Sequence, residues 1–258
     1  MTDKRTQEKA WVINQTEMIP GIMDLLIKAP KTAAAAAPGQ FVSVYCADKS
    51  RLLPRPISIC DADKFTGALR LVYRVGGAGT EEFSKLGPGE TIRIQGPLGN
   101  GFPLDADIQS VLIVGGGIGI PPLLYLAKNL TVKKTLVMGY PSVTYLDEEL
   151  AQHGDLYIAT EDGSRGTKGN VINAMEENGL TADAIMACGP LPMLKALKQY
   201  GAAHSMSVII SMEERMACGI GACLACVCET KDKDAHSHVR NARVCKDGPV
   251  FRTTEVVL

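Results

Sequence analysis

The sequence SVLIVGGGIGIPP, residues 110–122, decides the fold of the middle of this chain. Its first five residues are mostly apolar and β-branched, which is typical of a buried strand, and a glycine-rich turn follows at once. Glycine at such a turn lets the backbone approach a pyrophosphate, whose charge then faces the start of a helix. The GxGxxG pattern fails because Ile120 takes the place of its last glycine, whereas G-x-G-x-x-P fits Gly117, Gly119 and Pro122. These residues favour a dinucleotide-binding turn, and a tight turn without a ligand is the alternative.

The residues around this turn alternate between strand-like and helix-like segments. Short apolar runs of the buried-strand type continue along the chain as KTLVMG, DLYIAT, DAIMAC and SVII. Helical stretches such as PPLLYLAKNL and LPMLKALKQY lie between them. Strands that alternate with helices indicate a parallel, doubly wound sheet, so we predict an α/β nucleotide domain over residues 104–210.

The N-terminal part, residues 1–103, shows short strands broken by turns. FVSVYC (41–46), ALRLVYRV (68–75) and TIRIQG (91–96) alternate or are β-branched, and Pro-Gly and Gly-Pro pairs separate them. This pattern predicts an antiparallel β-barrel. For the alanines at residues 33–37 we expect a loop or strand entry, because five alanines beside a proline are too few to nucleate a helix.

Composition excludes several classes of protein. The chain has 258 residues, of which 46% are hydrophobic, and a formal net charge of −1, so it is globular and offers no electrostatic reason to bind nucleic acid or an anionic membrane. The charged N-terminus lacks the apolar core of a signal peptide. The most apolar stretch, residues 111–127, is interrupted by glycines and a Pro-Pro pair and is too short to span a membrane. We expect a cytoplasmic protein.

Cysteine is concentrated in the C-terminal segment, residues 211–258. Of 8 cysteines, five fall here, and a cytosolic chain does not keep disulfides, so the segment indicates metal or redox chemistry. The spacing Cys218-x4-Cys223-x2-Cys226, followed by Cys245, is that of plant-type [2Fe–2S] sites. Cys228 is surplus. We expect Cys226 and Cys228 to point to opposite faces of an extended segment, and we choose Cys226 because it keeps the x2 spacing.

A zinc site is the alternative for these cysteines. Zinc could be held by four cysteines, or by three together with His236 or His238. Structural zinc sites usually show two close pairs of ligands, and only one such pair exists here. The spacing therefore favours iron.

A second candidate site begins with Arg55-Pro56-Ile57-Ser58, which lies between two predicted strands. An arginine fork beside a hydroxyl can hold a phosphate, with the arginine as bidentate donor. An aromatic residue, a second cation and a glycine turn with a hydroxyl follow downstream. The full candidate set is Arg55, Pro56, Ile57, Ser58, Val72, Tyr73, Arg74, Gly79 and Thr80. Taken singly, each could be a surface arginine, a turn proline or a core tyrosine; their combination favours a binding site.

Cys188 ends the predicted strand DAIMAC and is followed by Gly189-Pro190. Ligands of open α/β sheets bind at the carboxyl edge of the strands, so this thiol could contact a nicotinamide and is a candidate catalytic residue. A small apolar filler is the alternative.

Three motifs in this order, RPxS, GGGIGxPP with a later CGP, and MACGIGACLACVC, resemble those of the ferredoxin reductase-like flavoproteins. The resemblance is closest to the family of dihydroorotate dehydrogenase B electron transfer subunits, and it covers nearly the whole chain. It implies that the barrel binds FAD through the candidate set that starts at Arg55. It also implies that a [2Fe–2S] cluster is held by Cys218, Cys223, Cys226 and Cys245.

The resemblance further implies a role in pyrimidine (UMP) biosynthesis with a partner protein. Dihydroorotate would be oxidised at the FMN of a separate dihydroorotate dehydrogenase catalytic subunit, and electrons would pass through the cluster and FAD to NAD⁺. A heterotetramer with two copies of each subunit is implied. The alternatives are a flavin and iron–sulfur reductase subunit of a hydrogenase, glutamate synthase or transhydrogenase complex, and a zinc-stapled binding module without redox activity.

The expected nucleotide is NAD(H) and not NADP(H). A 2′-phosphate needs a nearby cation, and the stretch from Met138 to Ser164, which follows the second strand of the predicted nucleotide domain, contains no Lys or Arg.

Overall fold

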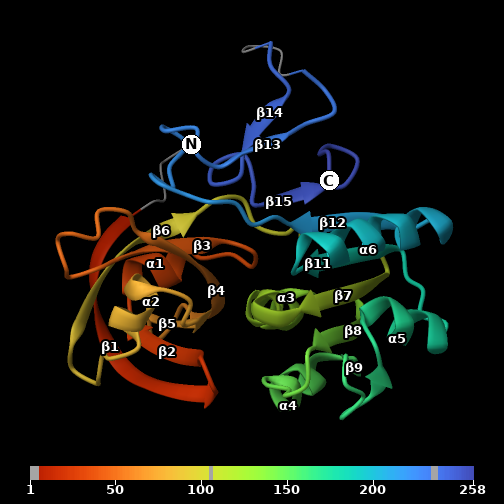
Figure 1. Cartoon of the computed structure of the whole chain (residues 1–258), viewed down its shortest axis with the longest axis horizontal. Helices are drawn as coiled ribbons and strands as arrows, with labels where there is room; N and C mark the ends of the chain where they lie inside the picture. The colour runs from red at the N-terminus through yellow and green to blue at the C-terminus, as the bar shows by residue number, and fades with distance from the viewer. Residues whose placement is uncertain (1–5, 105–106, 234–237) are drawn as a thin grey trace.

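The computed structural model describes residues 6–104, 107–233 and 238–258. A β-barrel and an α/β domain lie side by side, and the cysteine segment lies across the top of both (Figure 1). Among the described residues, no helix combines the length and the hydropathy needed to cross a bilayer.

The N-terminal domain is a closed antiparallel barrel with the strand order β1-β2-β5-β4-β3-β6. Its strands are β1 (Thr6–Ile19), β2 (Ile22–Lys28), β3 (Phe41–Tyr45), β4 (Arg55–Asp63), β5 (Ala68–Arg74) and β6 (Thr91–Leu98). Alternate side chains fill the interior, among them Leu25, Leu69 and Ile94. The predicted barrel is confirmed.

Two short helices accompany the barrel, α1 (Pro30–Ala35) and α2 (Ala78–Phe83). The expectation of a loop over the alanine run is wrong, because α1 includes its first three alanines. The Glu8 carboxylate on β1 accepts hydrogen bonds from the backbone N–H groups of Lys31 (2.9 Å) and Thr32 (2.8 Å) at the start of this helix. The helix is therefore stabilised by a tertiary contact that local nucleation arguments do not include.

The second domain is a seven-stranded sheet with the order β10-β9-β8-β7-β11-β12-β15. Its strands are β7 (Ser110–Gly116), β8 (Lys133–Tyr140), β9 (Asp155–Thr160), β10 (Thr167–Lys168), β11 (Ala184–Cys188), β12 (Ser207–Ser211) and β15 (Val250–Arg252). The helical segments are η1 (Gly117–Gly119), α3 (Pro121–Asn129), α4 (Asp147–Leu150), η2 (Ala151–His153), α5 (Val171–Glu177) and α6 (Leu191–Ala203). All strand pairs are parallel except β12 with β15, so the predicted doubly wound sheet is confirmed with one antiparallel edge.

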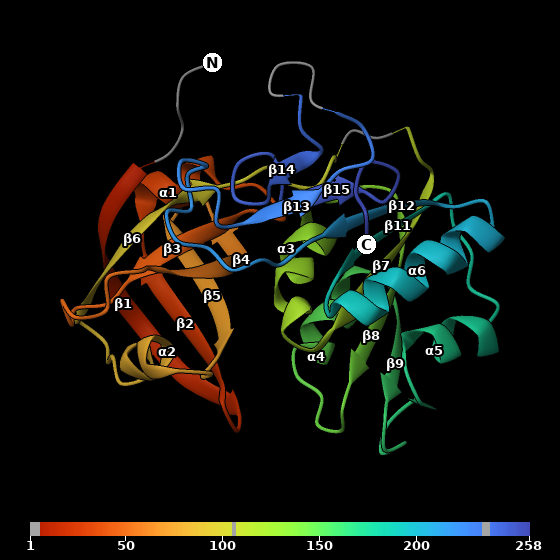
Figure 2. The same cartoon turned by 45° about the horizontal axis from the view of Figure 1, so that its top comes forward.

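Helices cover both faces of this sheet (Figure 2). Val111 and Ile113 of β7 belong to the cluster of buried side chains that includes α3, whereas Leu112 and Val114 belong to the one that includes α5 and α6. This alternation follows from the period of two in a strand. The α3 cluster also takes in barrel side chains such as Val72, so the barrel and the sheet share a core.

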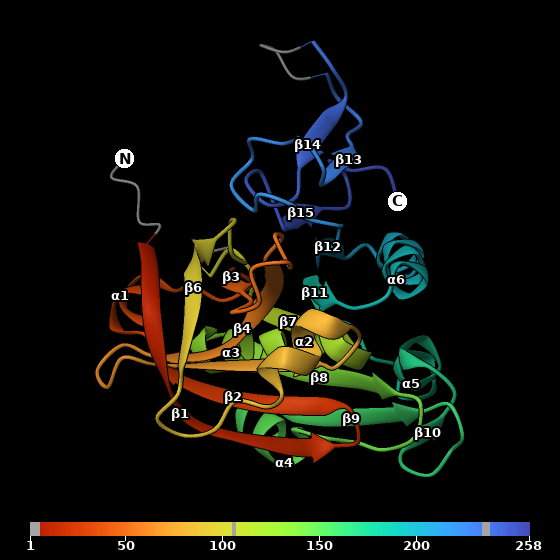
Figure 3. The same cartoon turned by 60° about the vertical axis from the view of Figure 1, so that its left-hand side comes forward.

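The cysteine segment is not a separate body. It contains a two-stranded sheet of β13 (Val227–Glu229) and β14 (Asn241–Arg243), which lies above the other domains in Figure 3. Its next strand, β15, pairs with β12 in the register Ile210↔Phe251 and forms the edge of the nucleotide sheet. The expected boundary between residues 210 and 211 therefore does not divide two independent units.

Arg70 joins the barrel to the nucleotide domain. Its Nη2 lies 2.8 Å from the Asp24 carboxylate on β2, and its Nη1 lies 2.6 Å from the Glu149 carboxylate on α4. The Arg70 side chain is only 17% exposed, which reduces the screening of both ion pairs by water. A second ion pair, between Lys128 on α3 and Asp61 on β4, crosses the same junction.

Replacing Arg70 by Leu should destabilise the protein by about 2 kcal/mol, because two half-buried carboxylates lose their partner. The free energy of unfolding, measured by urea denaturation, checks this. Lys85→Met is the control, because its ion pair with Glu81 is highly exposed and should contribute little. Equal effects of the two substitutions would contradict the role given to Arg70.

Candidate functional site

Arg55 stands at the mouth of a cleft between the barrel and the cysteine segment. The cleft has a volume of about 850 Å³ and is lined by residues 50–56 on one side and 213–216 on the other. The Arg55 guanidinium lies against Gly79 so closely that a Cβ atom at Gly79 would be 2.5 Å from Arg55 Nε. The structure thus brings together two members of the candidate set that are far apart in sequence.

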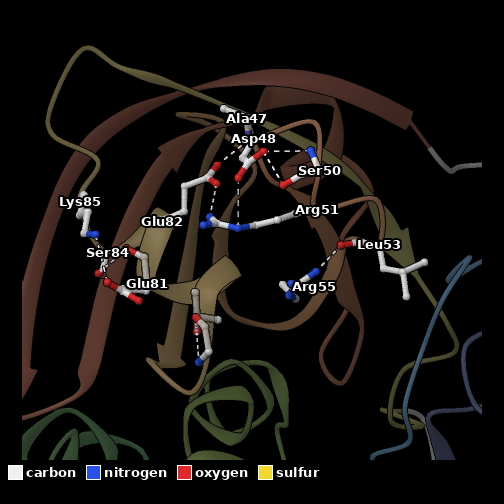
Figure 4. Close-up of polar contacts among 12 residues, drawn as sticks. Ala47, Asp48, Ser50, Arg51, Leu53, Arg55, Glu81, Glu82, Ser84 and Lys85 are labelled. Atoms are coloured by element: carbon white, nitrogen blue, oxygen red, sulfur yellow. Dashed lines mark hydrogen bonds and ion pairs between the residues drawn. The ribbon is translucent and has the colours of Figure 1, made fainter.

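The loop that leads to Arg55 is held in place by ion pairs with α2 (Figure 4). Arg51 Nη1 lies 2.5 Å from the Glu82 carboxylate, and Arg51 Nε lies 3.5 Å from the Asp48 carboxylate. The backbone N–H of Ala47 also donates to Glu82, at 2.5 Å. These contacts fix one wall of the cleft.

The remaining members of the set lie around Arg55, on β4, β5 and the start of α2. Pro56, Ile57 and Ser58 follow Arg55 along β4 and are partly exposed. Thr80 Oγ1 accepts hydrogen bonds from the backbone N–H groups of Gly76 and Gly77, at 3.0 and 3.2 Å, and closes the turn before α2.

Tyr73 differs from its neighbours on β5. Val72 packs toward the nucleotide domain and Arg74 is exposed, whereas the Tyr73 ring lies inside the barrel, 2% exposed and edge-on to Phe83. Its hydroxyl donates to Gln15 Oε1 at 2.9 Å, and burial raises the pKa of the phenol. The Tyr73 ring therefore packs in the barrel core, and the part that Tyr73 takes in FAD binding stays a prediction.

The glycine turn after β7 lies beside the barrel. Gly117 has a left-handed φ of 53°, and a Cβ atom there would lie 3.8 Å from Arg74 Nη2. Its carbonyl accepts a hydrogen bond from the Tyr145 hydroxyl at 2.7 Å. Gly119 packs directly on the carbonyl of Cys188, which leaves no room for a side chain. Pro122 is buried in the first turn of α3, where it contributes to packing.

The Cys188 thiol lies at the carboxyl end of β11, next to this turn. Burial raises its pKa to about 12, although a hydrogen bond with Ser211 opposes the shift. The thiol is therefore neutral at physiological pH. A neutral thiol can pack against a ring, and the predicted contact of Cys188 with a nicotinamide stays a prediction.

Cys218 has the features of a thiolate ligand. Its Sγ accepts hydrogen bonds from the backbone N–H groups of Ile220 (3.5 Å), Ala222 (3.3 Å) and Cys223 (3.4 Å). Burial alone would raise the pKa of this thiol, but these bonds and one from the Cys223 thiol lower it to about 6. The loop thus stabilises a negative charge on sulfur before any metal binds.

The four expected cluster ligands form two pairs. The Cys218 thiol interacts with Cys223, and the Cys245 thiol interacts with Cys226, whose Sγ also accepts from the Cys245 backbone N–H at 3.4 Å. Burial, followed by the neighbouring Cys226, raises the pKa of Cys245 to about 12. In the part of the chain that the structure describes, no three His, Cys, Asp or Glu side chains converge as a ready-made site for a metal ion.

Two pairs of thiols fit a [2Fe–2S] cluster, in which each of two irons takes two of the four thiolates. A zinc ion would need its ligands to meet at one point. Of the two histidines considered for zinc, His238 is exposed and His236 lies outside the described residues.

The expectation for Cys228 was wrong in its geometry. Residues two apart in a strand share a face, and Cys226 and Cys228 are both buried while Val227 between them is 38% exposed. What distinguishes the two thiols is their surroundings. Cys226 contacts Cys245, whereas Cys228 lies opposite Ala242 in the β13–β14 ladder.

Several residues that hold the cysteine segment gave no signal in the sequence. A Cβ atom at Gly219 would lie 2.7 Å from Ser43 Oγ on β3, so the loop touches the barrel there. Asn100, just after β6, donates from its backbone to the Gly248 carbonyl (2.6 Å) and from its side chain to the Asp247 carbonyl (2.9 Å). Arg243 bonds the Asp247 carboxylate (2.9 and 3.1 Å) and the Gly221 carbonyl (3.3 Å) around Cys245.

Comparison with known proteins agrees with this geometry. Residues 11–102 match the family described as "Oxidoreductase FAD-binding domain", and residues 213–257 match "Iron-sulfur cluster binding domain of dihydroorotate dehydrogenase B". The dihydroorotate dehydrogenase B (NAD(+)) electron transfer subunit of Geobacillus sp. (strain WCH70) is 45% identical over 98% of this chain and 99% of that protein. The chain belongs to this family of electron transfer subunits. The Bacillus mycoides (strain KBAB4) member is 42% identical over 96% of this chain and 97% of its own length.

Solved structures show the same arrangement of domains. An NADH-dependent reduced ferredoxin-NADP oxidoreductase structure aligns with a TM-score of 0.88 and 29% identity, over 97% of this chain and 90% of that one. The Amycolatopsis cytochrome P450 reductase GcoB aligns with a TM-score of 0.67 and 20% identity over 79% of this chain and 67% of its own, and supports the fold alone.

Cys226→Ser should abolish assembly of the iron–sulfur cluster, whereas Cys228→Ser should leave it intact, because only Cys226 is paired with Cys245. Iron and acid-labile sulfide per chain, with the visible spectrum, measure this. Loss of iron from the Cys228 variant alone would reverse the assignment.

Arg55→Ala should weaken FAD retention and leave the iron content unchanged, because Arg55 lines the barrel side of the cleft and is not one of the thiol ligands. Loss of one charge-assisted pair of hydrogen bonds corresponds to roughly tenfold or more in affinity. FAD per chain after gel filtration is the measurement, with Lys85→Ala, which removes a highly exposed cation outside the cleft, as the control that should retain FAD. Unchanged FAD content in the Arg55 variant would contradict its role.

Proposed function

We propose that this chain carries electrons from the oxidation of dihydroorotate, at the FMN of a separate catalytic subunit, to NAD⁺ through a [2Fe–2S] cluster and FAD. The single observation that carries the proposal is the position of the four thiols. Three of them lie on the loop that touches the barrel at Ser43. The fourth, Cys245, lies between β14 and β15, the strand that joins the nucleotide sheet. This activity belongs to pyrimidine (UMP) biosynthesis.

The barrel would hold FAD and the nucleotide domain would hold NAD⁺, the two molecules between which the hydride passes. Arg55 and the turn before α2 would hold the phosphates of FAD, and the β4 and β5 backbones would hold the rest of its length. When bound, FAD supplies the exchange between single electrons and a hydride. The half-buried Gly117 would present backbone to the pyrophosphate of NAD⁺, and Gly119 lets this turn pack against Cys188. The neutral Cys188 thiol would offer an uncharged contact to the nicotinamide.

The partner subunit would contact the exposed side of the cysteine loop. Cys223 and Ala222 are exposed, Leu224 is 59% exposed and Val227 is 38% exposed, so apolar surface surrounds the thiols on their outer side. Such surface is typical of a protein interface. A heterotetramer with two copies of each subunit, and a cytoplasmic location, in which thiolate ligands stay reduced, complete the proposal.

Reconstitution tests this proposal. The chain should reduce ferricyanide with NADH by itself, and should form NADH from dihydroorotate and NAD⁺ only when it is mixed with an FMN-containing dihydroorotate dehydrogenase subunit. The Cys226→Ser chain is the matched control: it should keep the ferricyanide reaction and lose the reaction with dihydroorotate.

The outcome that would contradict the proposal is also specific. A chain that reduces ferricyanide, but forms no NADH from dihydroorotate with that partner present, would serve a different complex. A chain that contains zinc and no flavin would have no redox role at all.

A further inference from the structure

The loops that follow β8 and β9 lie where the adenosine end of a dinucleotide is expected. In the sheet order, β8 and β9 lie on one side of β7 and its glycine turn, and β11 with Cys188 lies on the other. A pyrophosphate at Gly117, with the nicotinamide toward Cys188, directs the adenosine ribose toward the carboxyl ends of β8 and β9. This placement rests on the proposed function.

Arg165 is a cation at this edge of the sheet. It directly follows the stretch from Met138 to Ser164, which contains no Lys or Arg. Its backbone is fixed to the end of β9, because its N–H donates to Thr160 Oγ1 (3.0 Å) and its carbonyl accepts from the same hydroxyl (2.9 Å). An arginine at the end of this strand could bind a 2′-phosphate and favour NADP(H).

The Arg165 guanidinium is already engaged across the edge. Its Nη1 donates to Thr144 Oγ1 at 2.8 Å and forms an ion pair with the Asp147 carboxylate at the start of α4. The Asp147 side chain is only 12% exposed, whereas that of Arg165 is 52% exposed. The largely buried Asp147 carboxylate therefore holds the more exposed guanidinium of Arg165 at this position.

This edge also carries two carboxylates and one further cation, Lys168 at the end of β10. Glu161 and Asp162 follow β9 directly, and both are exposed. Hydrogen bonds from the Ser164 hydroxyl and its backbone N–H lower the pKa of Asp162, so this carboxyl is ionised at neutral pH. With Arg165 paired, a 2′-phosphate would meet two carboxylates and one exposed lysine, Lys168, whose side chain packs against Gly163.

We propose that Asp147 is a specificity-determining residue that keeps this chain selective for NAD(H), because it holds the Arg165 guanidinium away from a 2′-phosphate. Glu161 and Asp162 add repulsion against the phosphate. Asp147 acts through Arg165 and is a positioning residue.

Asp147→Asn tests this inference in the full chain with bound FAD. Release of Arg165 to a phosphate should raise the ratio of kcat/KM for NADPH to that for NADH by about tenfold, the equivalent of one charge-assisted hydrogen bond, mainly through a lower KM for NADPH. Inhibition by 2′-AMP, relative to 5′-AMP, should strengthen in parallel. Asp147→Glu, which keeps the charge, should preserve the NADH preference.

Two further variants separate this mechanism from a general effect of charge. Glu148→Gln removes a neighbouring charge on α4 that makes no ion pair with any described residue, and it should leave the ratio unchanged. The double variant Asp147→Asn/Arg165→Gln should lose the gain in NADPH use. Arg165→Gln alone should change the ratio little, because the arginine is already occupied.

Four results would overturn the inference. They are an unchanged ratio in a flavin-containing Asp147→Asn chain, an equal gain in Glu148→Gln, a gain that survives in the double variant, and a tenfold loss of NADPH use in Arg165→Gln. The last of these needs no change at Asp147, so the inference stays testable if Asp147→Asn does not fold. An unsubstituted chain that oxidises neither nucleotide would instead contradict the proposed function.

Discussion

Gly219 approaches the barrel so closely that a side chain there would meet Ser43 Oγ at 2.7 Å, and this contact constrains where the cysteine loop can lie. Electron transfer slows steeply as the distance between centres grows, so the cysteine loop must lie directly on the domain that binds flavin. Asn100 holds the other half of the ligand set from the same side, because it bonds the Gly248 and Asp247 carbonyls next to Cys245. The barrel therefore positions both pairs of thiols.

A shared sheet and shared cores join the barrel, the nucleotide domain and the cysteine segment. β15 leaves the cysteine segment and completes the nucleotide sheet, and buried side chains such as Cys226, Cys245 and Phe251 pack in one cluster with those of α5 and α6. Arg70, on the barrel strand β5, forms an ion pair with Glu149 on α4. In this arrangement the glycine turn, the cleft at Arg55 and the cysteine loop keep fixed relative positions, which is what the protein contributes to a chain of cofactors.

The sequence predicted what local patterns control, and missed what distant contacts control. The barrel, the doubly wound sheet and the glycine turn follow from strand periods and from one strand–turn–helix signal. The helix α1 was missed because its first turn is capped by Glu8 on β1, a contact that the local sequence does not show. The inward packing of the Tyr73 ring depends on closure of the barrel, which the local sequence does not show. Asn100 gave no signal because Asp247 is 147 residues away. The error at Cys228 was one of strand geometry, which the period of two would have avoided.

The most direct test of the account is the anaerobic visible spectrum of the purified chain, titrated with NADH. The spectrum should show flavin bands together with a broad absorption from the iron–sulfur cluster. Both should bleach as NADH is added, because the two centres lie in one electron-transfer path. Bleaching of the flavin with a persistent cluster absorption, or a colourless protein that contains zinc, would contradict it.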